Sequence, residues 1–297
     1  MTDSTSTTHF PGLRRRQALV LLPAALSAPW SALAQTELTD LDKVRARGTL
    51  KVAVYKDNAP FSSGPVSDMK GLDVSLAEAL ARQMNLKLSL LPFDAGENMG
   101  DDLRNMVWKG HYLGYGPADV MLQVPADRYL ANANPQVTIL APYMRQTNVL
   151  LHDTKRLADV NAPEDLKGVA LAAERGSGAA SVLMGYGSGL LRDQVAIYPS
   201  GVEAAQAVLD GKAVAAFVLR AQAESALSRQ TGPSDQFRIS KLSLHNGIAD
   251  NGWPVALAVK SSNKNLGAAL EAAMKSIRES GEMLTLFKQH GLTLAAP

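Results

Sequence analysis

Short apolar segments alternate with amphipathic ones in the first half of the chain, and this alternation limits the possible folds more than any other feature. Segments 50–54, 86–90 and 118–122 have the apolar pattern of strands, and segments 72–84 and 102–108 between them have helical spacing. A strand–helix series of this kind folds into a parallel sheet with right-handed connections. The sequence therefore predicts an α/β fold.

A second series of the same kind begins near residue 147. Its predicted strands are 147–151, 169–172, 213–218 and 255–259, and its predicted helices are 176–184, 201–209, 266–277 and 281–289. No low-complexity linker separates the two series. We therefore predict two lobes joined by two chain crossings, with lobe 1 at 35–146 plus 253–297 and lobe 2 at 147–252.

The first 34 residues have the pattern of an export signal. Arg14, Arg15 and Arg16 precede an apolar run, and Ala32-Leu33-Ala34 has the small-x-small pattern of a cleavage site. The paired arginines followed by Gln-Ala-Leu resemble a twin-arginine signal. A membrane anchor is the alternative, but the run is shorter than the roughly 20 apolar residues that a spanning helix needs. We expect cleavage after Ala34 and a periplasmic protein.

Composition excludes several classes of function. The chain has 30 Lys+Arg, 28 Asp+Glu and no cysteine. Residues 1–34 hold three of the arginines and one acid, which leaves 27 of each sign in 35–297. Balanced charge argues against a nucleic-acid partner, and without cysteine there is no disulfide, thiolate zinc site or cysteine nucleophile. We see no catalytic triad and no metal motif, so we expect a protein that is not an enzyme and has no cofactor.

Several segments together, in this order, resemble type II periplasmic solute-binding proteins of the polar amino-acid class (solute-binding family 3). They are Leu50–Val54 with Ala59–Ser62, Gly71–Ala77, Ala118–Met121, Ala141–Tyr143, Glu164–Gly168 and Arg175–Gly178. The resemblance implies the two-lobed periplasmic-binding-protein type II fold with a two-strand hinge. It also implies a small ligand held in the cleft between closing lobes, a monomer, and the membrane permease of an ABC importer as partner.

The resemblance also implies several ligand contacts. Arg128 takes the place of an arginine that clamps the ligand's carboxylate; the alternative is a surface arginine paired with Asp127 or another acid. Ser177 and Gly178 precede a helix, whose free N–H groups attract anions, although a plain helix cap needs the same residues. Phe93 takes the place of an aromatic residue that packs on the ligand, with the hydrophobic core as its alternative.

Other positions depart from the family pattern. Tyr55 and Leu219 replace acids that meet a ligand's ammonium group, Gln123 replaces a hydroxyl residue, and Arg220 adds a positive charge. These changes favour a polar or anionic solute over an ordinary α-amino acid. Asn58, in the loop after the first strand, completes the predicted site. The acids between Asp94 and Asp102 lack calcium-loop spacing, so we expect a solvated loop and helix cap.

An aromatic insertion at 110–117 follows the segment ending at Trp108. Because it precedes a strand, we expect it at the strand's amino end, away from the cleft. Trp108 and the Tyr side chains of the loop fit either a protein interface or local packing. Together with Val124-Pro125-Ala126, the loop resembles a branch of the same fold linked to quinoprotein methanol dehydrogenases. That branch predicts an alternative function, in which the protein docks on a periplasmic dehydrogenase.

Overall fold

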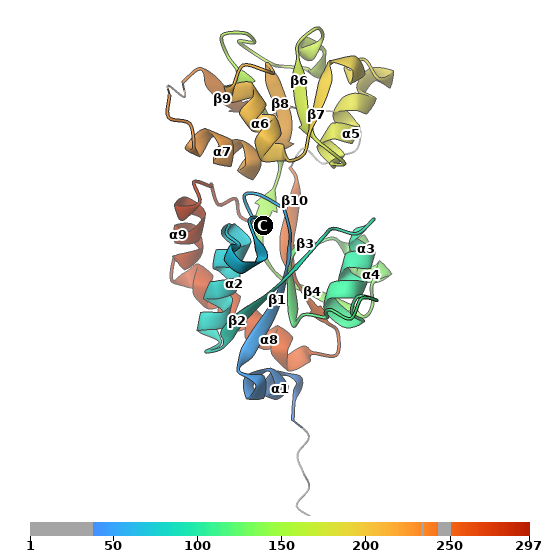
Figure 1. Ribbon diagram of the computed structural model, residues 1–297, viewed down its shortest axis with the longest axis vertical. Coiled ribbons are helices and arrows are strands. Elements are labelled where there is room, and N and C mark those ends of the chain that lie inside the picture. The colour runs from blue at the N-terminus through green and yellow to red at the C-terminus, as the bar shows by residue number, and fades with distance from the viewer. Residues whose placement is uncertain (1–37, 233–234, 243–250) are drawn as a thin grey trace, which may run out of the picture. The chain divides into compact units, whose positions relative to one another are not determined.

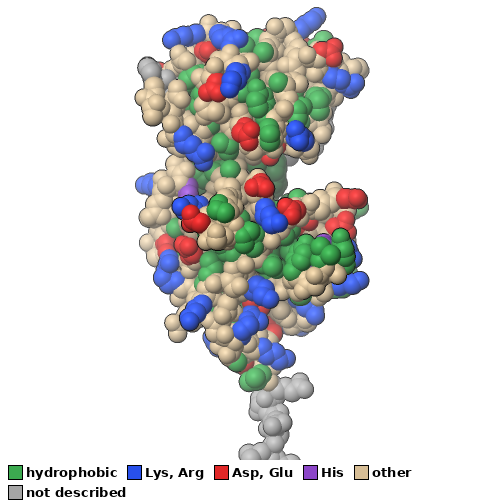
Figure 2. All heavy atoms as spheres, in the orientation of Figure 1, with side chains coloured by type: hydrophobic (Ala, Val, Ile, Leu, Met, Phe, Trp, Pro, Cys, Tyr) green, Lys and Arg blue, Asp and Glu red, His purple; other side chains and the backbone are tan. Residues whose placement is uncertain are grey.

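The chain forms two five-stranded mixed sheets, each with helices packed on both faces (Figure 1). The computed structural model describes residues 38–232, 235–242 and 251–297. The predicted α/β fold with two sheets is confirmed, whereas the lobe bounds remain predictions. The proposed signal at 1–34 lies outside the described residues. Side chains of both charge signs are spread over the visible surface, as the balanced composition predicts (Figure 2).

The first sheet takes its strands from both ends of the described chain. The strand order is β2-β1-β3-β10-β4, with β1 parallel to β2 and β3, and β10 antiparallel to β3 and β4. The strands are β1 (Thr49–Tyr55), β2 (Lys87–Phe93), β3 (Val120–Pro125), β4 (Val137–Gln146) and β10 (Trp253–Lys260).

Alternating side chains on β1 belong to two separate core clusters. Val52 and Val54 pack into the cluster that contains Leu76 and Leu80, and Ala53 packs into the cluster on the other face with Phe93. Helices therefore cover both faces of the first sheet. They are α1 (Asp40–Arg47), α2 (Leu72–Gln83), α3 (Met99–Leu103), α4 (Arg128–Ala133), α8 (Lys264–Glu279) and α9 (Glu282–Gln289).

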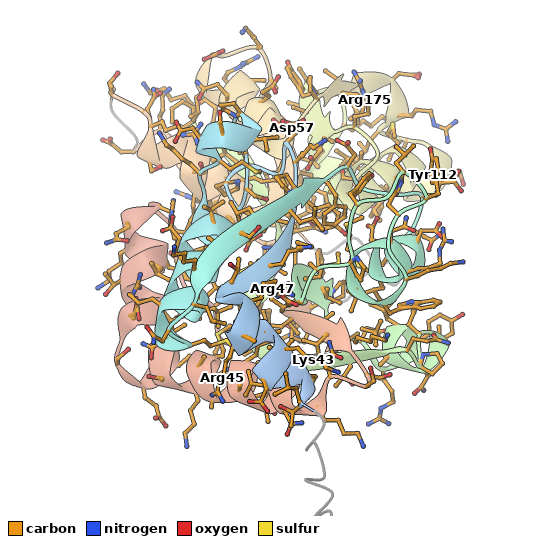
Figure 3. The ribbon with its side chains drawn as sticks, turned by 60° about the horizontal axis from the view of Figure 1, so that its bottom comes forward. Lys43, Arg45, Arg47, Asp57, Tyr112 and Arg175 are labelled. Atoms are coloured by element: carbon orange, nitrogen blue, oxygen red, sulfur yellow. The ribbon has the colours of Figure 1, made fainter. Side chains whose placement is uncertain are left out.

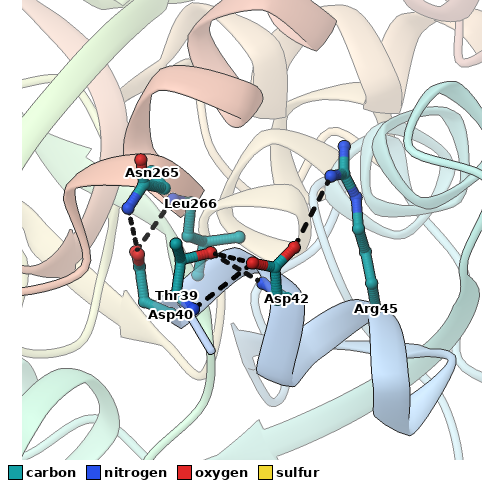
Figure 4. A network of polar contacts seen from close by, with 6 residues as sticks. All are labelled: Thr39, Asp40, Asp42, Arg45, Asn265 and Leu266. Atoms are coloured by element: carbon teal, nitrogen blue, oxygen red, sulfur yellow. Dashed lines mark hydrogen bonds and ion pairs between the residues drawn. The ribbon is translucent and has the colours of Figure 1, made fainter. Parts of the chain in front are cut away.

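Helix α1 is fastened to α8 through polar contacts at its N-terminus. Thr39 caps α1 by accepting a hydrogen bond from Asp42 N–H, while Asp40 accepts from Asn265 Nδ2 at 2.8 Å and from Leu266 N–H at 2.9 Å (Figure 4). Lys43 and Arg45 are exposed on the same helix (Figure 3). The first described residues are thus held against the C-terminal part of the chain.

The second sheet has the strand order β7-β6-β8-β5-β9. Its strands are β5 (Asn148–Asp153), β6 (Leu171–Glu174), β7 (Val195–Tyr198), β8 (Ala215–Leu219) and β9 (Phe237–Ser240), and its helices are α5 (Gly178–Gly185), α6 (Gly201–Leu209) and α7 (Arg220–Ser228). Alternate residues of β5 again separate two cores. Leu151 packs with Ala205 and Val208 of α6, and Leu150 packs with Leu183 of α5.

The chain passes from one sheet to the other at Thr147, between β4 and β5, and returns between β9 and β10. The two passages touch, because Gln146 pairs with Trp253 in the β4–β10 register. Gly252 has a φ of 66°, and a Cβ there would lie 1.8 Å from the carbonyl oxygen of Gln146. Only glycine fits this close approach. We call Gln146, Thr147, Gly252 and Trp253 the crossing.

A helix and a strand are among the elements that differ from the sequence predictions. The helix predicted at 102–108 begins at Met99, because Asn98 caps it by accepting from Asp101 N–H, and it changes to π-helical geometry from Arg104 to Trp108. The long strand β4 was not predicted, since Pro142 lies inside it. Proline is tolerated there because β4 is an edge strand of the sheet.

Substituting Gly252 with alanine tests the close approach at the crossing. Gly168→Ala is the matched control, because its φ is also positive and a Cβ there would meet no atom within 4 Å. The control carries only backbone strain, about 1 kcal/mol, whereas Gly252→Ala adds a clash with backbone and is expected to cost about 3 kcal/mol. Urea unfolding of both variants measures the difference. Equal losses would show that the crossing has room for a side chain.

A candidate ligand site at the carboxyl ends of the strands

Tyr55 and Phe93 end the neighbouring strands β1 and β2 and stand opposite each other in the parallel register. Their ring centroids are 4.5 Å apart. Phe93 is only 2% exposed, which favours the core alternative for this residue, and Tyr55 is half-buried. Ligands of open α/β sheets bind beyond the carboxyl ends of the strands, so both rings lie at the edge predicted for the site.

Asp102 lies beside Tyr55, and the expectation that it is solvated was wrong. The Tyr55 hydroxyl donates to Asp102 Oδ2 at 2.7 Å, and Gly96 N–H donates to Asp102 Oδ1 at 2.7 Å. Asp102 is 5% exposed; burial raises its pKa, and these two hydrogen bonds offset part of that rise. We call the first sheet with its helices the first body, and the second sheet with its helices the second body. The first body therefore does place an acid next to Tyr55, where the family resemblance led us to expect one missing.

Asn58 and Arg128 lie at the same edge of the first sheet. Asn58 forms a backbone turn in which its N–H donates to Ser62 O at 2.7 Å. Arg128 begins α4, behind the cap residue Asp127. The Arg128 side chain is exposed and makes no hydrogen bond or ion pair with any residue that the structure describes, so pairing with Asp127 is not observed. Its guanidinium is free to meet an anion.

Gln123 lies within β3 in a left-handed backbone conformation, with a φ of 61°. Its Nε2 donates to Asp73 Oδ1 at 3.0 Å, and its Oε1 accepts from Gln146 Nε2 at 2.8 Å. Its backbone N–H donates to the hydroxyl of Tyr143 at 3.2 Å. Gln123 is 8% exposed. Its carboxamide is therefore engaged with protein groups at both ends, a geometry that favours an internal role over the predicted ligand contact.

Asp73, in the first turn of α2, is fully buried. Oδ1 accepts from Gln123 and, at 3.4 Å, from the Tyr143 hydroxyl. Oδ2 is the one buried side-chain nitrogen or oxygen in the described part of the chain that has no hydrogen-bond partner. Burial raises the pKa of Asp73 to about 7, against the lowering effect of its two donors. No pattern in the sequence distinguished this acid from an ordinary first-turn aspartate.

Ser177 and Gly178 lie at the matching edge of the second sheet. The Ser177 hydroxyl accepts from Ala180 N–H at 3.0 Å and donates to the carbonyl of Glu174 at 2.9 Å. The first bond caps α5 and the second joins the cap residue to the end of β6, so local contacts account for this hydroxyl. Gly178 is exposed and has open space around its Cα.

A cavity of about 370 Å³ opens beside this cap. Its walls are mainly apolar, and Val218, Leu219 and Trp253 contribute to them. Ser177 and Gly178 line it together with Asn148, Glu174 and Gln222. This volume falls within the range of small-molecule sites, which are apolar with a few polar groups. The structure thus brings Ser177 and Gly178 together with Leu219 around one cavity, and adds Glu174.

Glu174 is the charged residue of this cavity, and the sequence analysis missed it. Gln222 Nε2 donates to Glu174 Oε2 at 2.8 Å, and Gln222 Oε1 accepts from Leu219 N–H at 3.0 Å. Burial raises the pKa of Glu174, and hydrogen bonds from Gln222 and Gly201 N–H offset part of the rise. No cation forms an ion pair with Glu174 among the described residues. Glu174 directly precedes the Arg175-Gly176-Ser177 segment of the family resemblance, and this position in the sequence could have drawn attention to it.

Arg220 does not line this cavity. It lies with Gln146, Thr147 and Phe61 around a small separate void, and its Nη1 is 3.5 Å from Glu224 Oε1. The extra positive charge that the sequence analysis placed in the cleft is therefore neutralised by a neighbour four residues away. Arg220 takes no part in the Glu174 cavity.

The described residues contain no cluster of His, Asp and Glu that could hold a metal ion. They also contain no helix that is both long and apolar enough to cross a membrane.

Comparison with known proteins supports the fold. No protein-family model and no curated protein matches the chain. An ancestral cationic amino acid solute-binding protein matches with 19% identity and a TM-score of 0.65, over 84% of this chain and 99% of its own. An amino acid ABC transporter substrate-binding protein from Streptococcus pneumoniae, bound to L-arginine, matches with 19% identity and a TM-score of 0.60, over 86% and 100%. At such identity the likeness shows the fold alone.

A third solved structure is of the same ancestral protein as the first. It is an ancestral amino acid-binding protein described as a precursor of cyclohexadienyl dehydratase, with 19% identity and a TM-score of 0.58, over 84% of this chain and 98% of its own. These three neighbours are described as amino-acid-binding or substrate-binding proteins, and none of the three is described as associated with a quinoprotein dehydrogenase.

The pKa of Asp73 predicts how stability depends on pH. The folded state raises this pKa from 3.8 to about 7, so the folded protein holds the proton more tightly than the unfolded chain. Asp73 therefore lowers the free energy of unfolding as pH rises from 4 to 7, by a total on the order of 4 kcal/mol, and adds no further change above pH 7.

Asp73→Asn removes this dependence. The stability of the variant relative to wild type should rise steadily between pH 4 and 7, as measured by urea unfolding at one-unit intervals. Glu78→Gln, an exposed acid on the same helix, is the matched control and should follow wild type. A constant difference between Asp73→Asn and wild type across this range would contradict the raised pKa.

Proposed function

We propose that this chain is an exported solute-binding protein of an ABC-type importer, and that its solute carries a cationic nitrogen, such as an ammonium or guanidinium group. The protein would capture the solute at the facing edges of its two sheets and deliver it to a membrane permease. Glu174 is the observation that carries the choice of solute.

The environment of Glu174 supports a cationic ligand. A partly buried carboxylate among apolar walls is costly to ionise without a cation nearby. Gln222 and Gly201 N–H donate hydrogen bonds to it, yet no described cation is paired with it. A Cβ at Gly201 would lie 1.9 Å from Gln222 Oε1, so a larger residue at this position would displace the Gln222 side chain that supports Glu174. The carboxylate is held in place and lacks a counter-charge, which a bound cation would supply.

This proposal changes the expectation of an anionic solute. That expectation rested on the missing acids at Tyr55 and Leu219. Asp102 lies beside Tyr55, and Glu174 shares a cavity with Leu219, so both bodies retain a carboxylate near the expected places. The free guanidinium of Arg128 adds a group suited to a ligand's carboxylate. The solutes named for the solved structures above, cationic amino acids and L-arginine, have the chemistry that such a set of groups would bind.

Binding measurements on the mature chain 35–297 test the proposal. The probes are L-arginine, L-lysine and putrescine on one side, and L-glutamate and succinate on the other, followed by calorimetry on any probe that raises the melting temperature. We expect a cationic probe to bind, and Glu174→Gln to weaken it at least 10-fold, because a hydrogen bond between charged groups contributes about 1.5–3 kcal/mol.

Asp193→Asn is the control, because it removes an exposed acid of the second body that does not line the cavity. This variant should bind like wild type. Binding restricted to the two acids, or full affinity in Glu174→Gln, would overturn the cationic assignment. Loss of affinity in Arg128→Ala with a carboxylate-bearing probe, but not with putrescine, would identify Arg128 as the group that binds the carboxylate.

The dehydrogenase alternative has one observation in its favour. Tyr112 and Leu113 of the 110–117 loop are 87% and 68% exposed (Figure 3), and hydrophobic side chains gather beside α3 and α4 (Figure 2). Tyr115 of the same loop packs against the hydrophobic cluster that contains Phe93, which fits the local-packing alternative for this residue. Capture of a purified quinoprotein dehydrogenase by wild type, lost in Tyr112→Ser with Leu113→Ser, would favour this function over import.

A further inference from the structure

Three polar side chains form a continuous path from the interior of the first body to the crossing. Asp73 Oδ1 accepts from Gln123 Nε2 at 3.0 Å, and Gln123 Oε1 accepts from Gln146 Nε2 at 2.8 Å. Asp73 is on α2, Gln123 on β3, and Gln146 is the last residue of β4. The path therefore joins three elements of the first body at the point where the chain leaves for the second.

Burial of the Asp73 carboxyl group, at one end of this path, has a high cost in free energy. The carboxyl group is fully buried, Oδ2 has no partner, and no described cation is paired with it. Among the described residues, hydrogen bonds bring two titratable groups to this part of α2. They are Tyr143 of β4, whose hydroxyl is 3.4 Å from Asp73 Oδ1, and His290, which follows α9 and whose Nε2 is 2.9 Å from Ser75 Oγ. An asparagine or an apolar residue would avoid the cost of burying an acid, so stability does not account for the choice of aspartate.

The middle of the path has a fixed direction. A carboxylate only accepts hydrogen bonds, so the Gln123 carboxamide must turn its NH₂ group toward Asp73 and its oxygen toward Gln146. The backbone of Gln123 is also constrained, with a left-handed φ of 61° and an N–H that donates to Tyr143. A charged acceptor forms a shorter and stronger bond than a neutral one. Ionisation of Asp73 therefore tightens its hold on Gln123.

The far end of the path is the crossing itself. Gln146 stands opposite Trp253 in the register of β4 and β10, and its carbonyl is in close contact with Gly252. The next residue, Thr147, accepts from Arg220 N–H of the second body at 2.9 Å. A change in the position of Gln146 would therefore also shift Gly252 and Trp253 in the other chain passage.

We propose that Asp73 is a positioning residue that orients Gln123 and, through it, Gln146 at the crossing, so that protonation of Asp73 changes the local geometry of the crossing. In the deprotonated state Gln123 is held firmly and Gln146 is fixed opposite Trp253. In the protonated state both glutamines are freer. The inference rests on the proposed function only in giving the crossing the role of a hinge, and it is independent of the ligand.

Trp253 provides a reporter that needs no ligand. Chain 35–297 contains two tryptophans, Trp108 and Trp253, so Trp108→Phe leaves Trp253 as the sole one. We expect its fluorescence emission to change in a single step with a midpoint near pH 7, the pKa to which burial raises Asp73. Asp73→Asn in the same background should lose the step. Glu78→Gln and His290→Gln, as controls, should keep it.

A second variant separates the acid from its effect at the crossing. Gln146→Leu removes the last hydrogen bond of the path without touching Asp73. Carboxyl ¹³C NMR should still show an aspartate that titrates near pH 7, while the fluorescence step is lost. A step that survives in Asp73→Asn or in Gln146→Leu would overturn the proposal, as would an Asp73 resonance that titrates near pH 4. Because no ligand is present, these outcomes are distinct from a failure of the cationic assignment for Glu174.

Discussion

The close approach of two chain passages at the crossing is the constraint on which the rest of the structure depends. Gln146 and Gly252 are in backbone contact, and the first sheet is completed by a strand that returns through this point. Because β4 ends and β10 begins there, the carboxyl ends of β1, β2 and β3 lie at the same edge of the sheet as the crossing. The second sheet begins at the same place, one residue later. The candidate ligand-site residues of both sheets therefore lie next to the crossing.

Polar groups near the crossing are held by long-range partners rather than by neighbours in sequence. Glu174 is held by Gln222, 48 residues away, and Asp73 by Gln123, 50 residues away. In both cases a carboxylate accepts from a glutamine amide whose oxygen accepts another N–H. Buried networks of this kind are stable only when their members are satisfied. Each of the two networks is incomplete at one point. Asp73 Oδ2 has no hydrogen-bond partner, and the Glu174 carboxylate has no counter-charge among the described residues. A proton at Asp73 or a bound cation at Glu174 would remove part of the cost of burying these groups.

The carboxyl groups of Glu174 and Asp73 can have different roles because their surroundings differ. Glu174 faces a cavity, so a charge can arrive from solution and pair with it. Asp73 faces only protein, so its charge can be compensated only by a proton. The same desolvation thus supports a recognition role at one carboxyl and a conformational role at the other.

Local patterns in the sequence determined the α/β class, most strand and helix positions, and the cap at Ser177, since periodicity and capping act within a few residues. The family resemblance, rather than periodicity, drew attention to Tyr55, Phe93 and Arg128. Local patterns did not predict β4, in which an edge position permits Pro142, or the burial of Asp102. Only the tertiary structure decided which acids are buried and which residues face them. The reason is that desolvation and pairing depend on segments about 50 residues apart in sequence, which become neighbours only after the sheets form.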